Sequence, residues 1–231
     1  MPMDWGKTCI VLIPKKDCAN RVSDFRPISL CNVCYKIISK ILTNRLKPVI
    51  HKLIGPEQNG FLAGKSTFDN IIAVQEIVHS LETDTQHPPR MLIKVDIEKA
   101  YDAMEWEAIL ATLKVMNFTE VWISWIRACI ISPSFSFIIN GQPSDWITPA
   151  RGVRQRDPIS PYLFLLVSQN LSSMLNHAMG LNMVPGFDHR LNRNLNHLMF
   201  ADDLIIITRA SRRDARNCSL CLDIYKRLIS P

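Results

Sequence analysis

The stretch Leu198-Met199-Phe200-Ala201-Asp202-Asp203-Leu204-Ile205-Ile206-Ile207 joins two apolar runs through a polar tip. This pattern is typical of a β-hairpin, and it predicts that Asp202 and Asp203 both lie at the turn. A second stretch, Met91-Leu92-Ile93-Lys94-Val95-Asp96, predicts a strand that ends at a third aspartate. If this strand lies beside the hairpin, the three carboxylates converge on one point.

Three carboxylates at one point need counter-charge, because neighbouring like charges disfavour shared ionisation. A pair of Mg²⁺ ions supplies it, and two hard cations bridged by carboxylates are suited to in-line phosphoryl displacement. The alternative is structural, since adjacent aspartates are ordinary turn residues. An aspartate at a strand end is also often just the first exposed residue after the core.

Composition sets the class of protein. The 231 residues are 47% hydrophobic, enough to bury a core in one or two domains. Lys and Arg number 27 against 21 Asp and Glu, and the net charge of +6 favours a polyanionic partner such as nucleic acid. No apolar run reaches the roughly 20 residues that span a bilayer, and the N-terminus lacks the basic segment of a signal peptide. We therefore expect a soluble intracellular protein, nuclear or cytoplasmic, without a membrane partner.

Periodicity predicts an α+β fold in which strands and helices interleave. The predicted strands cover residues 8–14, 91–96, 134–140, 144–148 and the two arms of the hairpin. The predicted helices cover residues 32–53, 68–81, 105–116, 120–131 and 157–179. Asn140-Gly141 predicts a tight turn between two strands, while Asp157-Pro158 predicts an N-cap followed by a proline in the first helical position.

The cysteines include two C-x-x-C spacings, Cys31/Cys34 and Cys218/Cys221. Zinc ribbons pair such motifs about 15–20 residues apart, whereas these lie at opposite ends of the chain. Each pair falls in a segment predicted as helical, where a spacing of three places both thiols on one face. Core cysteines are therefore favoured over a structural zinc site.

A series of motifs runs in order along most of the chain. They are Asp24-Phe25-Arg26-Pro27-Ile28-Ser29-Leu30-Cys31-Asn32-Val33, Gln58-Asn59-Gly60-Phe61, Lys99-Ala100-Tyr101-Asp102, Arg151-Gly152-Val153-Arg154-Gln155, Ser160-Pro161-Tyr162-Leu163-Phe164 and Phe200-Ala201-Asp202-Asp203. Their order and spacing resemble the reverse transcriptase domain of LINE-type (non-LTR) retrotransposons, especially plant ones. Group II intron maturases share several motifs, but Phe-Ala-Asp-Asp and Ser-Leu-Cys-Asn-Val favour the retrotransposon branch.

The resemblance implies the right-hand polymerase fold, with fingers at residues 1–89 and palm at residues 90–231. Helices of fingers and palm interleave, the boundary falls near the loop 82–90, and the palm carries the catalytic hairpin. Compared with the family, we expect a fragment that ends before the thumb and has no endonuclease domain before residue 1.

The resemblance also implies the site. Asp96 and Asp202 match the principal metal ligands and Asp203 the third carboxylate, for two Mg²⁺ ions with Mn²⁺ as the alternative. The implied partners are an RNA template, a DNA primer and dNTP. His197, just before the hairpin, is favoured as a packed histidine rather than a ligand.

Four further residues match substrate-binding positions of the family. Lys15 and Arg26 match the residues that clamp the triphosphate, although Lys15 reads equally well as a solvated turn lysine. Tyr101 matches the aromatic residue that excludes nucleotides with a 2′-hydroxyl. Without the resemblance, it would be interpreted as a core aromatic residue just past a strand. Gln155 matches the residue that touches the nucleotide.

The chain departs from the family at a few positions. Arg156 stands where the family favours Gly, which implies a positive φ or a close approach that a side chain obstructs. Ala103 replaces an Arg, while Lys65 and Thr67 are milder changes. Three functions stay open. They are an active RNA-directed DNA polymerase, a catalytically inactive remnant that binds nucleic acid, and a Mg²⁺-dependent hydrolase. The hydrolase has no motif of its own in this sequence.

Overall fold

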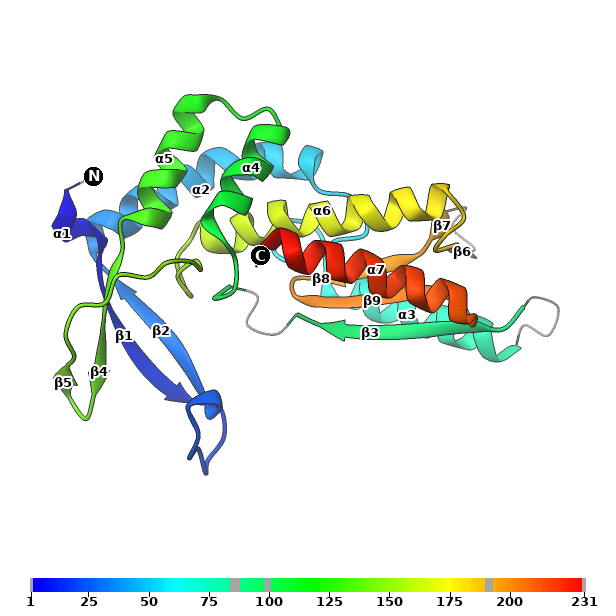
Figure 1. Ribbon diagram of the computed structural model, residues 1–231, viewed down its shortest axis with the longest axis horizontal. Coiled ribbons are helices and arrows are strands. Elements are labelled where there is room, and N and C mark those ends of the chain that lie inside the picture. The colour runs from blue at the N-terminus through cyan, green and yellow to red at the C-terminus, as the bar shows by residue number, and fades with distance from the viewer. Residues whose placement is uncertain (1, 84–87, 98–100, 190–192, 230–231) are drawn as a thin grey trace. The chain divides into compact units, whose positions relative to one another are not determined.

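Strand β1 (Lys7–Pro14), whose residues Cys9 to Ile13 form a continuous apolar run, is an inner strand of a four-stranded sheet with the order β2-β1-β4-β5. The computed structural model describes residues 2–83, 88–97, 101–189 and 193–229. The described chain forms two compact units, one of residues 1–48 and 101–163, the other of residues 49–100 and 164–231. Figure 1 labels the elements of both.

The sheet of the first unit is mixed. Strand β2 (Phe25–Cys31) pairs antiparallel with β1, and β4 (Ser134–Ile139) pairs parallel with it. Strand β5 (Gln142–Pro143) returns from β4 through Asn140 and Gly141, whose φ values are 50° and 80°. Two positive φ values are the signature of a type I′ hairpin turn, so the predicted Asn-Gly turn is confirmed.

Helices complete the first unit. They are α1 (Met3–Gly6), the 3₁₀ turn η1 (Val22–Asp24), the first part of α2 (Val33–Leu53), α4 (Trp106–Val115), α5 (Glu120–Ile131) and the first turn of α6 (Ser160–Gly180). Thr119 caps α5, because its hydroxyl accepts a hydrogen bond from the Trp122 amide at 3.3 Å.

The second unit contains a three-stranded antiparallel sheet with the order β3-β9-β8. Its strands are β3 (Arg90–Asp96), β8 (His197–Phe200) and β9 (Asp203–Arg209). A separate two-stranded ribbon joins β6 (Phe187–His189) and β7 (Arg193–Leu195). The predicted position of the Asp96 strand beside the hairpin is therefore confirmed.

Helices cover both faces of this sheet (Figure 1). Helix α3 (Thr67–Thr83) lies on one face, where Ile77 packs with Leu198 and Ile207 in a buried cluster. The remainder of α6 and helix α7 (Arg212–Ile229) lie on the other face. Apolar burial on both faces explains why β9 reads as a nearly continuous apolar run, with Leu204, Ile206 and Ile207 fully buried.

The structure corrects several sequence predictions. Helix α6 begins at Ser160 and not at Asp157, because the buried Asp157 carboxylate bonds to Tyr35 and Ser39 instead of capping the helix. Strand β5 replaces the strand expected at residues 144–148, of which only Ile147 pairs, as a bridge to Phe135.

The two cysteine pairs differ from each other. Cys31 ends β2 and Cys34 lies in the first turn of α2, so the prediction that they share a helix face is wrong. Cys218 and Cys221 are both buried on α7, which confirms core cysteines there. Within the described residues, no helix has both the length and the apolar character needed to cross a membrane.

Candidate active site

Strand pairing brings two of the three predicted aspartates together. Asp96, the last residue of β3, lies directly opposite Asp203, the first residue of β9. Directly opposed residues of antiparallel strands project from the same face, with Cβ atoms about 4.5–5.5 Å apart. The sequence separates these residues by more than a hundred positions, and the sheet register makes them neighbours.

The hairpin turn lies one residue earlier than predicted. Phe200 pairs with Asp203, so the two turn residues are Ala201 and Asp202, and Asp203 belongs to the strand. Ala201 has a φ of 54°. A positive φ at only the first turn position is the pattern of a type II′ turn, where glycine is usual. The prediction that both aspartates lie at the turn is therefore wrong for Asp203.

A lysine, for which the sequence pattern indicated no role, accompanies the two opposed aspartates. The Lys94 ammonium lies 3.2 Å from Oδ1 of Asp203. Lys94 and Asp96 are two positions apart on β3, so their side chains share a face of the sheet. That spacing was visible in the sequence, but the diagonal approach to Asp203 depended on the strand register.

Among the residues that the structure describes, no three His, Cys, Asp or Glu side chains lie close enough together to hold a metal ion. Asp96 and Asp203 nevertheless fit a hard cation, because they offer carboxylate oxygens from one face of the sheet. Asp202 follows Ala201 in the turn and is half-buried. The metal-binding roles of the three aspartates remain predictions.

His197 belongs to a buried polar network behind the hairpin. Its Nε2 lies 2.8 Å from the Ser172 hydroxyl, and its Nδ1 lies 2.6 Å from Oδ1 of Asn196. Burial lowers the pKa of the ring to about 4, although the nearby Glu57 carboxylate acts in the opposite direction. His197 is fully buried, which confirms that it is a packed histidine.

Lys15 and Arg26 lie at the same end of the β1–β2 pair. Arg26 pairs with Ile13, and Lys15 follows the last residue of β1. The Lys15 ammonium donates to the Ser23 carbonyl at 2.9 Å, and neighbouring Lys16 forms an ion pair with Asp24 at 2.9 Å. Lys15 and Arg26 are both exposed, so a clamp on phosphate is compatible with their position.

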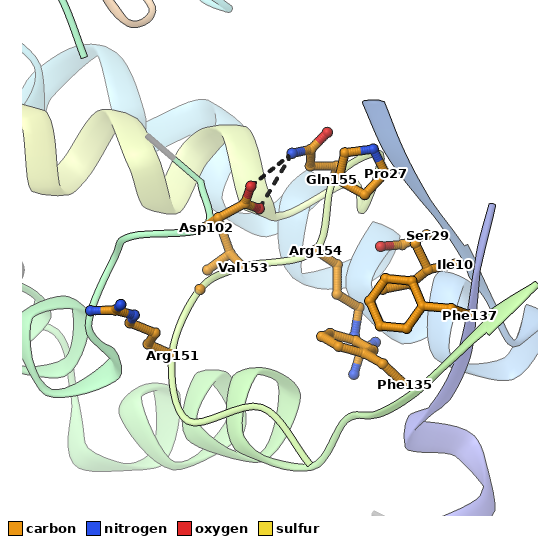
Figure 2. A pocket seen from close by; sticks show the side chains of 11 residues that line it. Ile10, Pro27, Ser29, Asp102, Phe135, Phe137, Arg151, Val153, Arg154 and Gln155 are labelled. Carbon is orange, nitrogen blue, oxygen red and sulfur yellow. Dashed lines mark hydrogen bonds between the residues drawn. The ribbon is translucent and has the colours of Figure 1, made fainter. Parts of the chain in front are cut away.

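Tyr101 and Gln155 belong to two segments of the first unit that are joined by hydrogen bonds. The Val153 amide donates to the Tyr101 carbonyl at 2.9 Å, which lays the loop at residues 151–155 beside the segment at residues 101–104. Gly152 has a φ of 87°, and a Cβ on it would lie 3.0 Å from the Asp102 carbonyl oxygen. Gln155 donates from Nε2 to Oδ1 of Asp102 at 3.3 Å (Figure 2). The loop is therefore held close to the segment at residues 101–104.

A cavity of about 250 Å³ opens beside this loop (Figure 2). Polar groups of Gln155 and Asp102 lie at one side, and the rings of Phe135 and Phe137 line another. Buried Arg154 contributes to the lining, and its guanidinium lies 3.8 Å from the centre of the Tyr35 ring.

A buried carboxylate anchors the end of this loop. The Tyr35 hydroxyl donates to Oδ2 of Asp157 at 2.5 Å, and Ser39 donates to Oδ1. Burial raises the pKa of Asp157, against the effect of these hydrogen bonds and of Arg154. The Asp157-Pro158 pattern predicted a helix cap at Asp157, whereas the partners of its carboxylate lie more than a hundred residues away in the chain.

Arg156 lies between Gln155 and this anchor with a φ of 70°. Non-glycine residues rarely adopt this left-handed conformation. The expectation that the position requires a positive φ is therefore confirmed. Arg156 itself is exposed.

Comparisons with known proteins identify the family. A model described as reverse transcriptase (RNA-dependent DNA polymerase) matches residues 13–228. This chain belongs to the reverse transcriptase family. The predicted membership among the reverse transcriptases of non-LTR retrotransposons is confirmed.

Two relatives of this chain come from mobile elements. The chain is 31% identical to the Retrovirus-related Pol polyprotein from type-2 retrotransposable element R2DM of Drosophila melanogaster, over 85% of its length and 18% of the polyprotein. It is 24% identical to the Transposon TX1 uncharacterized 149 kDa protein of Xenopus laevis, over 97% of its length and 17% of that protein. The chain thus spans less than a fifth of either relative.

The fold of this chain is similar to that of a solved telomerase. The structure of telomerase from Candida tropicalis in complex with a TWJ fragment of telomeric RNA covers 97% of this chain and matches it with a TM-score of 0.61. Sequence identity is 13%, and the match covers 39% of the telomerase chain. The likeness therefore concerns the fold.

Proposed function

We propose that this chain is the fingers and palm part of an RNA-directed DNA polymerase, which adds dNTP to the 3′-hydroxyl of a primer on an RNA template. The observation that carries the proposal is the opposition of Asp96 and Asp203 beside the Ala201–Asp202 turn. Membership in the reverse transcriptase family supports it. The likeness to telomerase, solved with telomeric RNA, supports the right-hand fold and an RNA partner.

In this proposal Asp96, Asp202 and Asp203 hold two Mg²⁺ ions. When bound, such ions lower the pKa of an attacking hydroxyl and stabilise charge on the departing pyrophosphate. Asp96 and Asp203 supply carboxylates from two paired strands, so their separation is set by backbone hydrogen bonds rather than by flexible side chains. Lys94 offsets their repulsion while no cation is bound.

The residues of the first unit bind the nucleotide. Lys15 and Arg26 neutralise the triphosphate, for which an ammonium and a planar guanidinium are suited. Tyr101 packs against the sugar and disfavours a 2′-hydroxyl, which makes the substrate dNTP rather than NTP. Gln155, held by Asp102, contacts the same nucleotide.

Primer extension tests the proposal. The chain is incubated with an RNA template, an annealed DNA primer, dNTPs and Mg²⁺, and product length is measured. Asp96→Asn and Asp203→Asn should each lower extension by at least about 10³-fold, a scale typical of lost transition-state stabilisation. The exposed Asp223 on α7 provides the matched control, since Asp223→Asn makes the same change outside the site. Equal extension by all four proteins would refute the assignment.

A second candidate function is nucleic-acid binding without turnover. The left-handed conformation of Arg156 supports it, because the side chain imposes strain beside the nucleotide-binding Gln155. The absence of a three-ligand cluster among the described residues is consistent with it. Template binding without extension, in the assay above, would favour this alternative.

A further inference from the structure

The segment Gln58-Asn59-Gly60 lies against the hairpin that carries Asp202 and Asp203. Gln58 pairs with Met199 of β8 as a short parallel bridge. The Met199 amide donates to the Glu57 carbonyl at 2.8 Å, and the Asn59 amide donates to the Met199 carbonyl at 3.0 Å. The segment thus adds to the free edge of β8, next to the turn.

The Gln58 side chain reaches the turn itself. Its Oε1 accepts hydrogen bonds from the Ala201 amide at 3.0 Å and the Gly60 amide at 2.7 Å. Its Nε2 donates to the Ala201 carbonyl at 3.3 Å. Gln58 is only 2% exposed. One buried amide therefore satisfies both backbone groups of Ala201, which is the residue with the positive φ.

The close approach depends on Gly60. A Cβ on Gly60 would lie 2.4 Å from the Ala201 nitrogen, closer than any side chain can sit. The segment is fixed from its other side as well, because the Lys65 ammonium donates to the carbonyls of Pro56 and Gln58. Asn70 of α3 donates to the Met199 carbonyl at 3.0 Å.

These contacts hold a turn that costs energy. A left-handed φ in a residue other than glycine costs about 1–2 kcal/mol and persists only where the surroundings impose it. Asp203 is held opposite Asp96 by the pairing of β3 with β9. Ala201 directly precedes Asp202 in the turn, so the conformation of Ala201 sets where the Asp202 carboxylate lies relative to these two aspartates.

We infer that Gln58 is a positioning residue: its buried amide clamps the backbone of Ala201 and so sets the geometry of the Asp96–Asp202–Asp203 carboxylates. The catalytic consequence rests on the proposed polymerase function. Groups that orient metal ligands typically contribute 10–100-fold to metal affinity or activity.

Gln58→Met tests the inference, because methionine has nearly the same length and shape but forms none of the three hydrogen bonds. The exposed Gln75 of α3, in the same unit, supplies the matched control Gln75→Met. Amide hydrogen exchange is measured by NMR. We expect Ala201 to exchange at least about 10-fold faster in Gln58→Met only, on the scale of one lost hydrogen bond, while Ile206 and Ile207 of β9 stay protected.

Metal and rate measurements test the catalytic consequence. Binding of Mn²⁺ as a paramagnetic probe should weaken by about 10–100-fold in Gln58→Met and stay unchanged in Gln75→Met. In primer extension, kcat should fall by a similar factor while KM for dNTP changes little, since Gln58 touches no substrate.

The outcomes separate this inference from the proposed function. Unchanged exchange at Ala201, or equal acceleration of all β9 amides, would overturn the clamp whether or not the chain is a polymerase. Lack of extension by the unaltered chain would refute the polymerase proposal and leave the exchange result to decide on the clamp. Faster exchange at Ala201 with unchanged Mn²⁺ affinity and kcat would overturn the positioning role.

A second variant applies if Gln58→Met does not fold. Gln58→Glu keeps both accepting interactions and loses only the donation to the Ala201 carbonyl. We expect it to retain the slow exchange of Ala201, and fast exchange in the folded variant would contradict the inference.

Discussion

The Lys94 ammonium lies 3.2 Å from the Asp203 carboxylate, which in turn stands opposite Asp96 in the strand register. A cation therefore already occupies the face of the sheet from which both carboxylates project. Any divalent ion that binds there competes with Lys94 for Asp203.

Replacing this lysine should strengthen metal binding. We expect Lys94→Met to raise Mn²⁺ affinity several-fold, measured by calorimetry, because Asp203 no longer has an internal counter-charge. Both partners of the pair are largely exposed, so the free energy of unfolding should change by less than about 1 kcal/mol. Lys226→Met, an exposed substitution on α7, is the control. Weaker Mn²⁺ binding in Lys94→Met would show that Lys94 organises the site instead of competing in it.

Replacing Arg156 by glycine should stabilise the chain. Its φ of 70° costs about 1–2 kcal/mol in a residue with a Cβ, and the greater entropy of unfolded glycine offsets about 0.4–1 kcal/mol. We expect a net gain of up to about 1.6 kcal/mol in the free energy of unfolding, measured in urea. Arg21, with a φ of −117°, is the matched control, and Arg21→Gly should be neutral or destabilising. Similar effects at both positions would mean that the left-handed conformation carries no strain.

The same variant should also improve catalysis. Gln155, the proposed nucleotide contact, directly precedes Arg156, so relaxing the backbone at Arg156 changes the position of Gln155. We expect Arg156→Gly to raise dNTP incorporation by more than it raises template affinity. A rate effect on the order of 10²-fold is expected for a group misplaced by a small distance. Equal extension by both proteins would mean that arginine is tolerated at this position.

Stability should fall in mild acid because of His197. Its pKa is about 4 in the folded chain and 6.5 when unperturbed, so between these values the unfolded state binds a proton that the folded state does not. The contribution of neutral His197 to the free energy of unfolding is fully present above pH 6.5 and is lost as the pH falls towards 4. The loss is up to about 3 kcal/mol.

Urea unfolding at several pH values checks this dependence. His197→Gln should flatten it, whereas His177→Gln, at an exposed position of α6, should leave it unchanged. Burial raises the pKa of Asp157, so its contribution to the free energy of unfolding increases as the pH falls, opposite to that of His197. This contribution is present in both variants. An unaltered pH profile in His197→Gln would contradict the assignment.

Binding to a primer–template should weaken with salt. If Lys15 and Arg26 each neutralise one phosphate, replacing either by glutamine should reduce the slope of log affinity against log salt by roughly 0.7–0.9. Fluorescence anisotropy across a salt series measures the slope. Lys114→Gln, an exposed change at the end of α4, should leave the slope as it is. Affinity that does not depend on salt would refute phosphate contacts altogether.

Local patterns in the sequence predicted most elements correctly, because helices and tight turns depend on neighbouring residues. Helix α2 occupies residues 33–53 where periodicity placed it, and Asn140-Gly141 forms the expected turn. The order of the motifs was enough to identify the family. The apolar runs around Asp96, Asp202 and Asp203 were enough to indicate the carboxylates of the candidate site.

Features that depend on residues far apart in the chain could not be predicted from local patterns. The one-residue shift of the hairpin turn, the partners of Asp157 and the role of Gln58 all involve residues far apart in the chain. Gln58-Asn59-Gly60 belongs to one of the motifs that resemble the family, yet no neighbouring residue in the sequence indicates that Gln58 contacts Ala201.

By itself, the sequence determined most of the helices, the Asn140-Gly141 turn and which aspartates end or follow apolar runs, since those depend on side-chain pattern over a few residues. Only the tertiary structure decided that Asp96 opposes Asp203, that Lys94 lies beside them and that Gln58 clamps Ala201. The physical reason is register: burying both faces of β9 selects one alignment of its neighbours, and a slip of one residue would turn every side chain to the wrong face.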